Sequence, residues 1–250
     1  MIERAVVDSV AVVRMAHGKV NAFDVEFLDA LRDTFLALDQ EPYAGVVLTG
    51  TGSAFSAGVD LRRLVAEGAD YVHRFLPLLD QAFEAVFDVR RPVVAAVNGH
   101  ALAGGFVLLA ACDDRLLADG RARIGLPEVR VGVPFPAVPL EIVRFAAPMI
   151  AQHLVTTGRT YGVHEIVALG LPAEVVSPDD LLSAAVERAR DLAERIPEAT
   201  FALTKRQLRA EAHERIRTGR ATTESDVVDI WTSEASFTWI DRYLAEVTRR

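Results

Sequence analysis

The chain has 250 residues, of which 51% are hydrophobic and 25% are charged, a composition typical of a globular protein with a sizeable core. Its formal net charge of −8 repels nucleic acid and anionic membrane surfaces on average, so we expect neither as a partner. Cys112 is the only cysteine, which excludes an intramolecular disulfide and a thiolate metal cluster. The first ten residues contain acids and no long apolar run, which predicts a cytoplasmic protein without a signal peptide.

The first ninety residues alternate between strand and helix patterns. Two β-branched runs at 5–7 and 10–15 flank Asp8-Ser9, which predicts a hairpin. Asp24 is a good N-cap for a helix that reaches about Gln40, since apolar residues recur there at helical spacing. The other elements predicted in this part are a buried strand at 45–49, a glycine-rich loop at 50–60, a helix from Leu61 and a longer helix around 71–88.

The segment Pro92–Cys112 holds 21 residues without a formal charge. Its length alone would allow a membrane span. Asn98, His100 and three glycines near its centre favour instead a buried strand, a turn and a buried helix.

The second half predicts strands that give way to helices. Three prolines make 132–139 a rigid, non-helical bend. Alternating strands and helices indicate an α/β layered domain with parallel strands. The composition changes near the end, which predicts a core at 1–195 and a helical region at 196–250. The remaining elements are strands at 115–118, 123–124 and 173–176, and helices at 140–145, 150–157, 163–169, 179–196, 200–216 and 226–247.

Several standard catalytic motifs are missing from the sequence. No G-x-S-x-G elbow frames Ser53 or Ser56, so a serine hydrolase triad has no anchor. The six histidines are scattered and show no metal-ligand spacing. The glycine-rich stretch at 50–58 follows a strand but lacks the G-x-G-x-x-G spacing and a Walker lysine, which argues against a dinucleotide fold.

Two strand-to-helix turns, at 56–60 and 102–105, place small residues where a helix starts. Backbone N–H groups at helix starts are unpaired, and the helix dipole adds positive potential. Side by side, two such turns would form an oxyanion hole from main chain alone. The glycines could equally serve only to let the helices pack closely.

Glu128 lies between apolar residues in a proline-bent segment. A carboxylate in apolar surroundings has a raised pKa and can act as a general base. The alternative is an exposed loop glutamate without a chemical role.

Four motifs together resemble the crotonase superfamily, the enoyl-CoA hydratases and isomerases. The resemblance implies a spiral of repeated β-β-α units, a homotrimer or a hexamer built from two trimers, and a C-terminal trimerisation region. It also implies an acyl-CoA thioester as substrate, with coenzyme A entering as part of that substrate and no separate cofactor. The motifs are AFSAGVDL at 54–61, PVVAAVNGHALAGG at 92–105, ACD at 111–113 and IGLPEVRVGVP at 124–134, and Asn21-Ala22 also fits.

The family's functional positions can be carried over one by one. Its oxyanion hole maps onto the backbone N–H groups of Val59 and Gly104, and Ala57 falls where a backbone carbonyl meets the adenine. Asp60 and Leu61 belong to the same coenzyme-binding motif. Because coenzyme A is anionic, we expect cations near these motifs, and the candidates are Lys19, Arg14, Arg62 and Arg63.

The resemblance also implies which reaction to expect. The family's hydratases use two glutamates, and this chain has Val107 at one position and Glu128 at the other. One base can move a double bond, so the pattern resembles Δ3,Δ2-enoyl-CoA isomerases. Candidates for the acyl pocket are Val107, Phe106, Phe135, Phe75 and Leu79, although apolar residues at helical spacing more often belong to the core.

Two alternatives stay open at this stage. The first is a hydratase, hydrolase or decarboxylase in which Glu141, Asp80 or Glu84 supplies the second acid. The second is a coenzyme A-binding subunit without catalytic activity, in which Glu128 has no chemical role.

Overall fold

The computed structural model describes residues 1–248. A six-stranded sheet with the order β1-β2-β4-β7-β9-β12 forms its centre. The hairpin β1–β2 is antiparallel, and every other neighbouring pair in this sheet is parallel. The strands are β1 (Ile2–Val7), β2 (Val10–Met15), β4 (Gly45–Thr49), β7 (Val93–Val97), β9 (Asp114–Ala118) and β12 (Glu174–Val176).

Two smaller sheets lie beside it. One has the order β11-β10-β8-β5, and the other pairs β3 with β6 in parallel. Three successive units, β4–β5, β7–β8 and β9–β10, each place their first strand in the large sheet and their second in the four-stranded one. This repetition is the predicted β-β-α spiral. The strands are β3 (Ala22–Phe23), β5 (Ala54–Ser56), β6 (Gly58–Val59), β8 (His100–Leu102), β10 (Ile124–Gly125) and β11 (Thr160–Tyr161).

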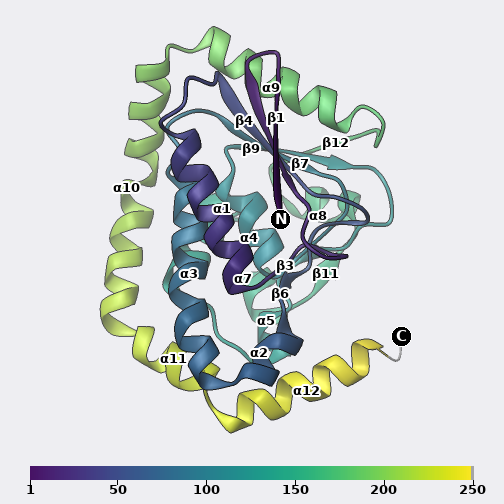
Figure 1. The fold of residues 1–250 in the computed structure, drawn as a ribbon, viewed down its shortest axis with the longest axis vertical. Helices are drawn as coiled ribbons and strands as arrows, with labels where there is room; N and C mark the ends of the chain where they lie inside the picture. Colours follow the sequence, from purple (N-terminus) through teal and green to yellow (C-terminus); the bar gives the residue numbers. More distant parts are fainter. Residues whose placement is uncertain (249–250) are drawn as a thin grey trace.

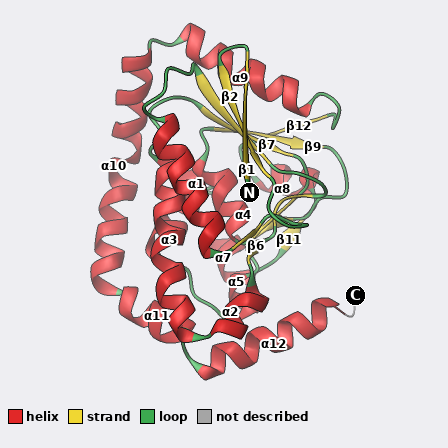
Figure 2. Ribbon diagram, viewed as in Figure 1, coloured by secondary structure: helices red, strands yellow, loops and turns green. Residues whose placement is uncertain are grey.

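Helices cover both faces of the large sheet (Figures 1 and 2). α9 (Leu181–Arg195) lies on one face, where Ala185 and Ala189 pack against Val47 and Val94. The other face packs against α1, α3 and α4 in the main core. The helices of the first three quarters are α1 (Val25–Leu38), α2 (Leu61–Glu67), α3 (Ala69–Phe87), α4 (Gly104–Ala111), α5 (Glu128–Val131), α6 (Ala137–Ala146), α7 (Ala151–Thr157) and α8 (Val163–Leu169).

Local sequence signals account for most of these elements. Asp8 and Ser9 adopt the positive φ angles of a tight hairpin turn. Asp24 caps α1 by accepting a hydrogen bond from the N–H of Phe27 at 2.8 Å. Asp60 caps α2 in the same way. These predictions are confirmed, as is the buried strand at 45–49.

The apolar segment Pro92–Cys112 is a buried strand, a turn and a buried helix, as predicted. The turn also contains β8, and the helix α4 begins at Gly104. All eight residues of α4 are buried. No helix in the described part of the chain has both the length and the apolarity that crossing a membrane requires.

Two predicted helix boundaries are wrong, one near Pro139 and one near Ser233. α6 begins at Ala137, so Pro139 lies in its first turn, where a missing N–H costs no intrahelical hydrogen bond. The predicted helix 226–247 is two helices, because Ser233 breaks it and accepts a hydrogen bond from the N–H of Ser236 at 3.1 Å. The loop 50–60 also contains two short strands, β5 and β6.

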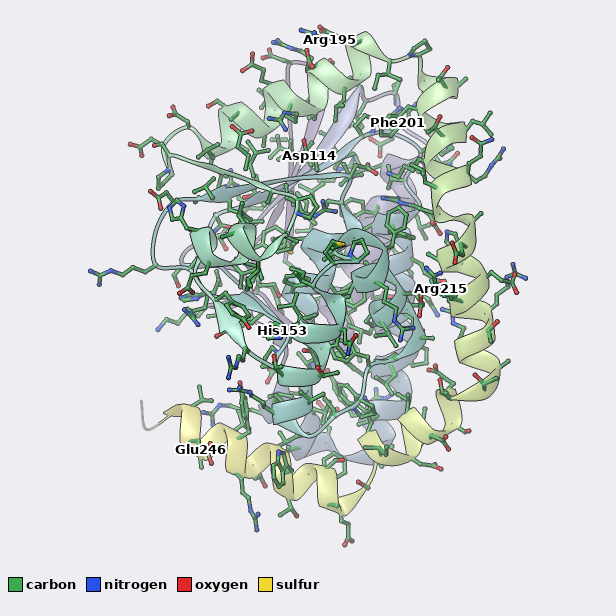
Figure 3. All side chains as sticks on the ribbon, turned by 180° about the vertical axis from the view of Figure 1, so that it is seen from behind. Asp114, His153, Arg195, Phe201, Arg215 and Glu246 are labelled. Carbon is green, nitrogen blue, oxygen red and sulfur yellow. The ribbon has the colours of Figure 1, made fainter. Side chains whose placement is uncertain are left out.

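The C-terminal helices wrap around the rest of the molecule. Figure 3 shows α10 from behind, with Phe201 and Arg215 on it, and Figure 1 shows α12 crossing the lower end. Ile216, Trp231 and Ile240 from these helices belong to the main core. The predicted boundary after residue 195 falls between α9 and α10, while the trimerisation role stays a prediction. The helices are α10 (Glu198–Thr222), α11 (Glu224–Trp231) and α12 (Glu234–Thr248).

Candidate active site

Two backbone segments pass against each other at the start of α4. Gly58 has φ +80°, and a Cβ added to it would lie 2.7 Å from the Cβ of Ala103 and 3.0 Å from the backbone N of Gly104. A Cβ added to Gly105 would lie 2.2 Å from the carbonyl oxygen of Ser56. The glycines therefore do allow close packing, and they bring the two turns side by side.

This packing brings together the turns that carry the two predicted oxyanion donors, the N–H groups of Val59 and Gly104. Asp60 donates its N–H to the carbonyl of Phe23 at 2.9 Å. Since backbone groups alternate along a strand, the N–H of Val59 points to the other side. Gly104 is the first residue of α4, so its N–H has no acceptor in that helix, and the helix dipole makes it more positive. Ala103 before it has a strained φ of +52°, a feature that concentrates at functional sites.

A cavity of about 80 Å³ opens beside these groups. Its walls are mostly apolar, with one carboxylate among the described residues. Larger hollows of about 440 Å³ lie beside Arg209 and beside Leu36, away from the two turns. The small cavity is lined by Ala57, Val59, Leu61, Leu102, Ala103, Pro127, Glu128, Val131, Val133, Trp231 and Tyr243.

Glu128 supplies that carboxylate from the first position of α5. Part of the residue reaches the surface, but its Oε2 atom is buried and has no hydrogen-bond partner among residues 1–248. Burial raises the pKa of the Glu128 carboxyl to about 8, because an apolar site penalises the charged form. The alternative of an exposed loop glutamate is therefore wrong.

The comparisons with known proteins identify the family of this chain. The family model described as enoyl-CoA hydratase/isomerase matches residues 6–242. The chain belongs to the enoyl-CoA hydratase/isomerase family, within the crotonase superfamily. A carnitinyl-CoA dehydratase of Salmonella arizonae is 38% identical over 194 residues, which cover 76% of this chain and 74% of that protein.

Solved structures of the enoyl-CoA hydratase/isomerase family have the same fold. A probable enoyl-CoA hydratase of Mycobacterium tuberculosis is 30% identical and superimposes with a TM-score of 0.82, covering 90% of this chain and 95% of that one. The human mitochondrial Δ3,Δ2-enoyl-CoA isomerase superimposes with a TM-score of 0.91, covering 99% and 98%. Its 24% identity shows the shared fold alone.

Two of the four predicted coenzyme-binding residues line the cavity, and the other two do not. Ala57 and Leu61 line it. The N–H of Ala57 donates a hydrogen bond to the carbonyl of Val20 at 3.0 Å, which fixes the link between β5 and β6. Asp60 is occupied as the cap of α2. Lys19 is exposed and stays a prediction as a partner of the coenzyme.

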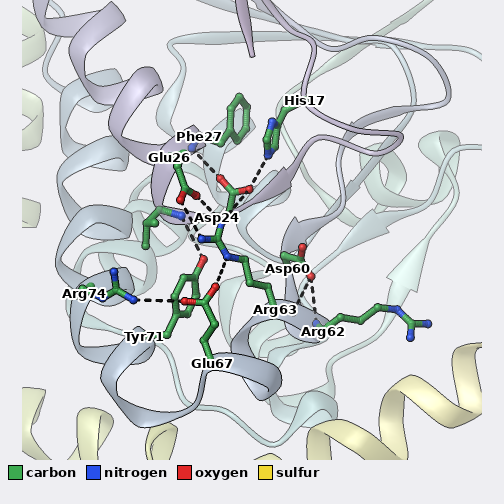
Figure 4. A network of polar contacts seen from close by, with 11 residues as sticks. His17, Asp24, Glu26, Phe27, Asp60, Arg62, Arg63, Glu67, Tyr71 and Arg74 are labelled. Atoms are coloured by element: carbon green, nitrogen blue, oxygen red, sulfur yellow. Dashed lines mark hydrogen bonds and ion pairs between the residues drawn. The ribbon is translucent and has the colours of Figure 1, made fainter.

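The predicted cations differ in how much they are engaged. Arg63 forms ion pairs with Glu26, Glu67 and Asp24, and these three carboxylates largely neutralise its charge (Figure 4). The side chain of Arg62 points away from that network. Arg14 lies on β2 with Glu3 opposite it. The contact of Arg62, Arg14 or Lys19 with a coenzyme phosphate stays a prediction.

The three residues predicted for the acyl pocket do not line the cavity. Phe106 and Val107 are buried in α4 as part of the main core. Phe135 is partly buried and packs against the same core. Their contact with an acyl chain stays a prediction.

The candidate second acids lie elsewhere and are held by arginines. Glu141 is buried and forms ion pairs with Arg144 and Arg215. Asp80 and Glu84 both pair with Arg220, at 3.3 Å and 2.7 Å. None of these three carboxylates lines the cavity.

Trp231 and Tyr243 were missed by the sequence analysis. They line the cavity from α11 and α12, more than 100 positions after Glu128. Their only signal in the sequence is an aromatic residue on the apolar side of a tail helix, which does not distinguish a pocket wall from ordinary core.

Proposed function

We propose that this protein is an enoyl-CoA isomerase that moves a double bond from C3–C4 to C2–C3 of an acyl-CoA thioester. One observation carries the proposal: Glu128 is the one carboxylate, among residues 1–248, that lines the cavity beside the two turns. Moving a double bond needs one group that takes and returns a proton. Adding water benefits from a second carboxylate, and that position holds Val107.

The proposed reaction balances with Glu128 alone. Its carboxylate takes a proton from C2 of a 3-enoyl thioester, the electrons of the C2–H bond form a double bond between C1 and C2, and the carbonyl electrons move onto the thioester oxygen, which gives a dienolate. The N–H groups of Val59 and Gly104 donate hydrogen bonds to that developing oxyanion. The carboxylic acid then returns the proton at C4, which regenerates the carboxylate and needs no water or redox partner.

The apolar walls of the cavity support this role. A dry site strengthens the hydrogen bonds to the oxyanion and raises the proton affinity of the base. An oxyanion-hole donor contributes roughly 10²–10³ in rate. The carboxylate and the N–H donors act on different atoms of the substrate, so a cavity that holds both fits the reaction.

A second candidate is hydration or dehydration, and the carnitinyl-CoA dehydratase that is 38% identical favours it. In that reaction Glu128 would still be the base. The phenol of Tyr243 would be the one hydroxyl group among the described side chains that line the same cavity.

Glu128→Gln tests the proposed base. The amide keeps the size of the side chain but cannot accept the C2 proton, so we expect turnover to fall by at least about 10², the lower range for general base catalysis. Acyl-CoA binding, measured by calorimetry, should stay within a few-fold of wild type. Full activity of this variant would remove Glu128 from the mechanism, and binding without turnover in the wild type would favour the non-catalytic alternative.

A further inference from the structure

Both tryptophans of the chain belong to the C-terminal helices, and both donate hydrogen bonds to the segment that carries Glu128. The indole Nε1 of Trp231 donates to the carbonyl of Pro134 at 2.9 Å. The indole Nε1 of Trp239 donates to the carbonyl of Arg130 at 2.8 Å. Two helices that are distant in the sequence therefore hold one short segment, residues 128–134, which we call the base segment.

The base segment depends on such outside contacts. Its helix α5 has only four residues, a length at which a helix is unstable alone. The C-cap of α5 is Gly132, which has φ +91° and donates its N–H to the carbonyl of Glu128 at 3.0 Å. The N–H of Val133 bonds to the same carbonyl at 3.1 Å. The backbone of Glu128 is thus tied to the part of the segment that the indoles hold.

The indole of Trp239 also rests on this backbone. A Cβ added to Gly132 would lie 2.5 Å from Cδ1 of Trp239. Ser236, one turn earlier in α12, is close to the carbonyl of Gly132, at 3.5 Å. α12 therefore follows the base segment closely and bonds to its outward-facing carbonyl groups.

Trp231 has a second contact with the site, because it lines the cavity together with Glu128. Its side chain is almost fully buried, whereas Trp239 is 50% exposed. The same indole thus holds the base segment through its N–H and closes the cavity with its ring. Removing it would both loosen the segment and admit water beside the carboxylate.

We propose that Trp231 and Trp239 are positioning residues for Glu128, so that the C-terminal helices complete the active site of their own chain. This inference rests on the proposed role of Glu128 as the base. The two indoles fix the backbone of α5, and Trp231 keeps water from the carboxyl group. A base that is displaced by about 1 Å loses up to about 10² in rate.

The test uses Trp231→Phe, Trp239→Phe and the double variant, which keep an aromatic ring but lack the N–H donor. The readout is kcat and kcat/KM from about pH 5 to pH 10, with whichever enoyl-CoA the wild type turns over. We expect kcat to fall about ten- to a hundredfold in the double variant, with KM changed less than about threefold. The rise of kcat/KM should move to lower pH in variants that carry Trp231→Phe, because a phenyl ring is smaller than an indole and leaves room for water, which lowers the pKa of the carboxyl group.

Ile240→Val is the matched control. Ile240 is fully buried in α12 next to Trp239, and the change removes one methyl group without touching an indole N–H. We expect it to lower the melting temperature while leaving kcat and the pH profile unchanged. Trp239→Phe, at a half-exposed position, keeps the test available if Trp231→Phe folds poorly.

Two outcomes would overturn the inference. One is a folded double variant with the kcat and pH profile of the wild type. The other is an equal change in Ile240→Val, which would mean that any loosening of α12 has this effect. Failure of the proposed function is distinguishable, because it shows as activity that survives in Glu128→Gln whatever the tryptophan variants do.

Discussion

Glu128 combines an apolar environment with the proposed role of a base, which needs the charged form of its carboxyl group. The pKa of its carboxyl group is raised to about 8 by burial. A base must be deprotonated before it accepts a proton, so activity should increase as the pH rises through that value. We expect kcat/KM to fall about tenfold for each pH unit below the midpoint and to level off above it. A flat profile between about pH 6 and pH 9 would contradict this assignment of the base.

Asp80 shows the same effect without a role at the cavity. Burial raises the pKa of its carboxyl group to about 7, although the nearby Arg220 opposes the shift. Between about pH 4 and pH 7 the folded protein therefore keeps a proton that the unfolded chain releases, and stability decreases as the pH rises through this range.

Asp80→Asn removes this dependence because an amide does not ionise. The difference in unfolding free energy, variant minus wild type, should increase by about 1–3 kcal/mol from pH 5 to pH 8. Arg220 keeps Glu84 as a partner, at 2.7 Å, so the variant does not leave it unpaired. Urea denaturation at both pH values measures the difference, and an identical offset at the two would argue against a protonated Asp80.

The sequence predicts part of the site at the scale of single residues. The two glycine-rich turns and a glutamate between apolar residues are local signals, while the roles predicted for Val59 and Gly104 come from the resemblance to the crotonase superfamily. The burial of Oε2 is not local, since residues from α11 and α12 help to enclose the cavity. Trp231 and Tyr243 are missed for the same reason.

At the scale of elements, α4 begins at Gly104, the proposed oxyanion donor, and its other end contacts a buried arginine of β9. Arg115 donates hydrogen bonds to the carbonyls of Leu109, Ala110 and Cys112 at 3.0, 3.1 and 2.6 Å. A positive charge at this end also complements the helix dipole. Arg115 therefore holds the end of α4 opposite Gly104.

Arg115→Met should lower the free energy of unfolding by about 2–4 kcal/mol, because buried carbonyl groups lose their donors. Arg121→Met is the matched control, since that arginine is exposed and the change should stay within about 0.5 kcal/mol. Denaturation of both variants at one pH compares them. Equal stability of the two would show that Arg115 contributes little to α4.

Element boundaries show where local prediction fails. The prolines at 134, 136 and 139 correctly predict a bend, but the last of them is tolerated in the first turn of α6. The spacing of apolar residues predicts one helix over 226–247, whereas the hydroxyl of Ser233 caps a second helix within that range. In both cases a few side-chain and backbone hydrogen bonds determine where a helix begins or ends. The spacing of apolar residues contains no information about them.

At the scale of the whole molecule, charged groups attach the C-terminal region to the core. Lys205 and Arg209 of α10 are buried and form ion pairs with Asp113 at 2.7 and 2.9 Å. The apolar face of α10 is weak, and such pairs are not visible in a periodicity pattern. The sequence therefore predicts the helices of the tail but not that α11 and α12 fold back over the cavity.

The predicted homotrimer or hexamer belongs to this scale too. Trp231 of α11 and Tyr243 of α12 line the cavity of their own chain, and the oligomeric state stays a prediction.

The most direct test of the account follows a 3-enoyl-CoA and crotonyl-CoA side by side with the same purified protein. A single carboxylate beside a backbone oxyanion hole predicts rapid conversion of the 3-enoyl-CoA to the 2-enoyl-CoA. Hydration of crotonyl-CoA should be slower by about 10² or more, the effect of one missing acid–base group. Rapid hydration of crotonyl-CoA without isomerisation would contradict the account.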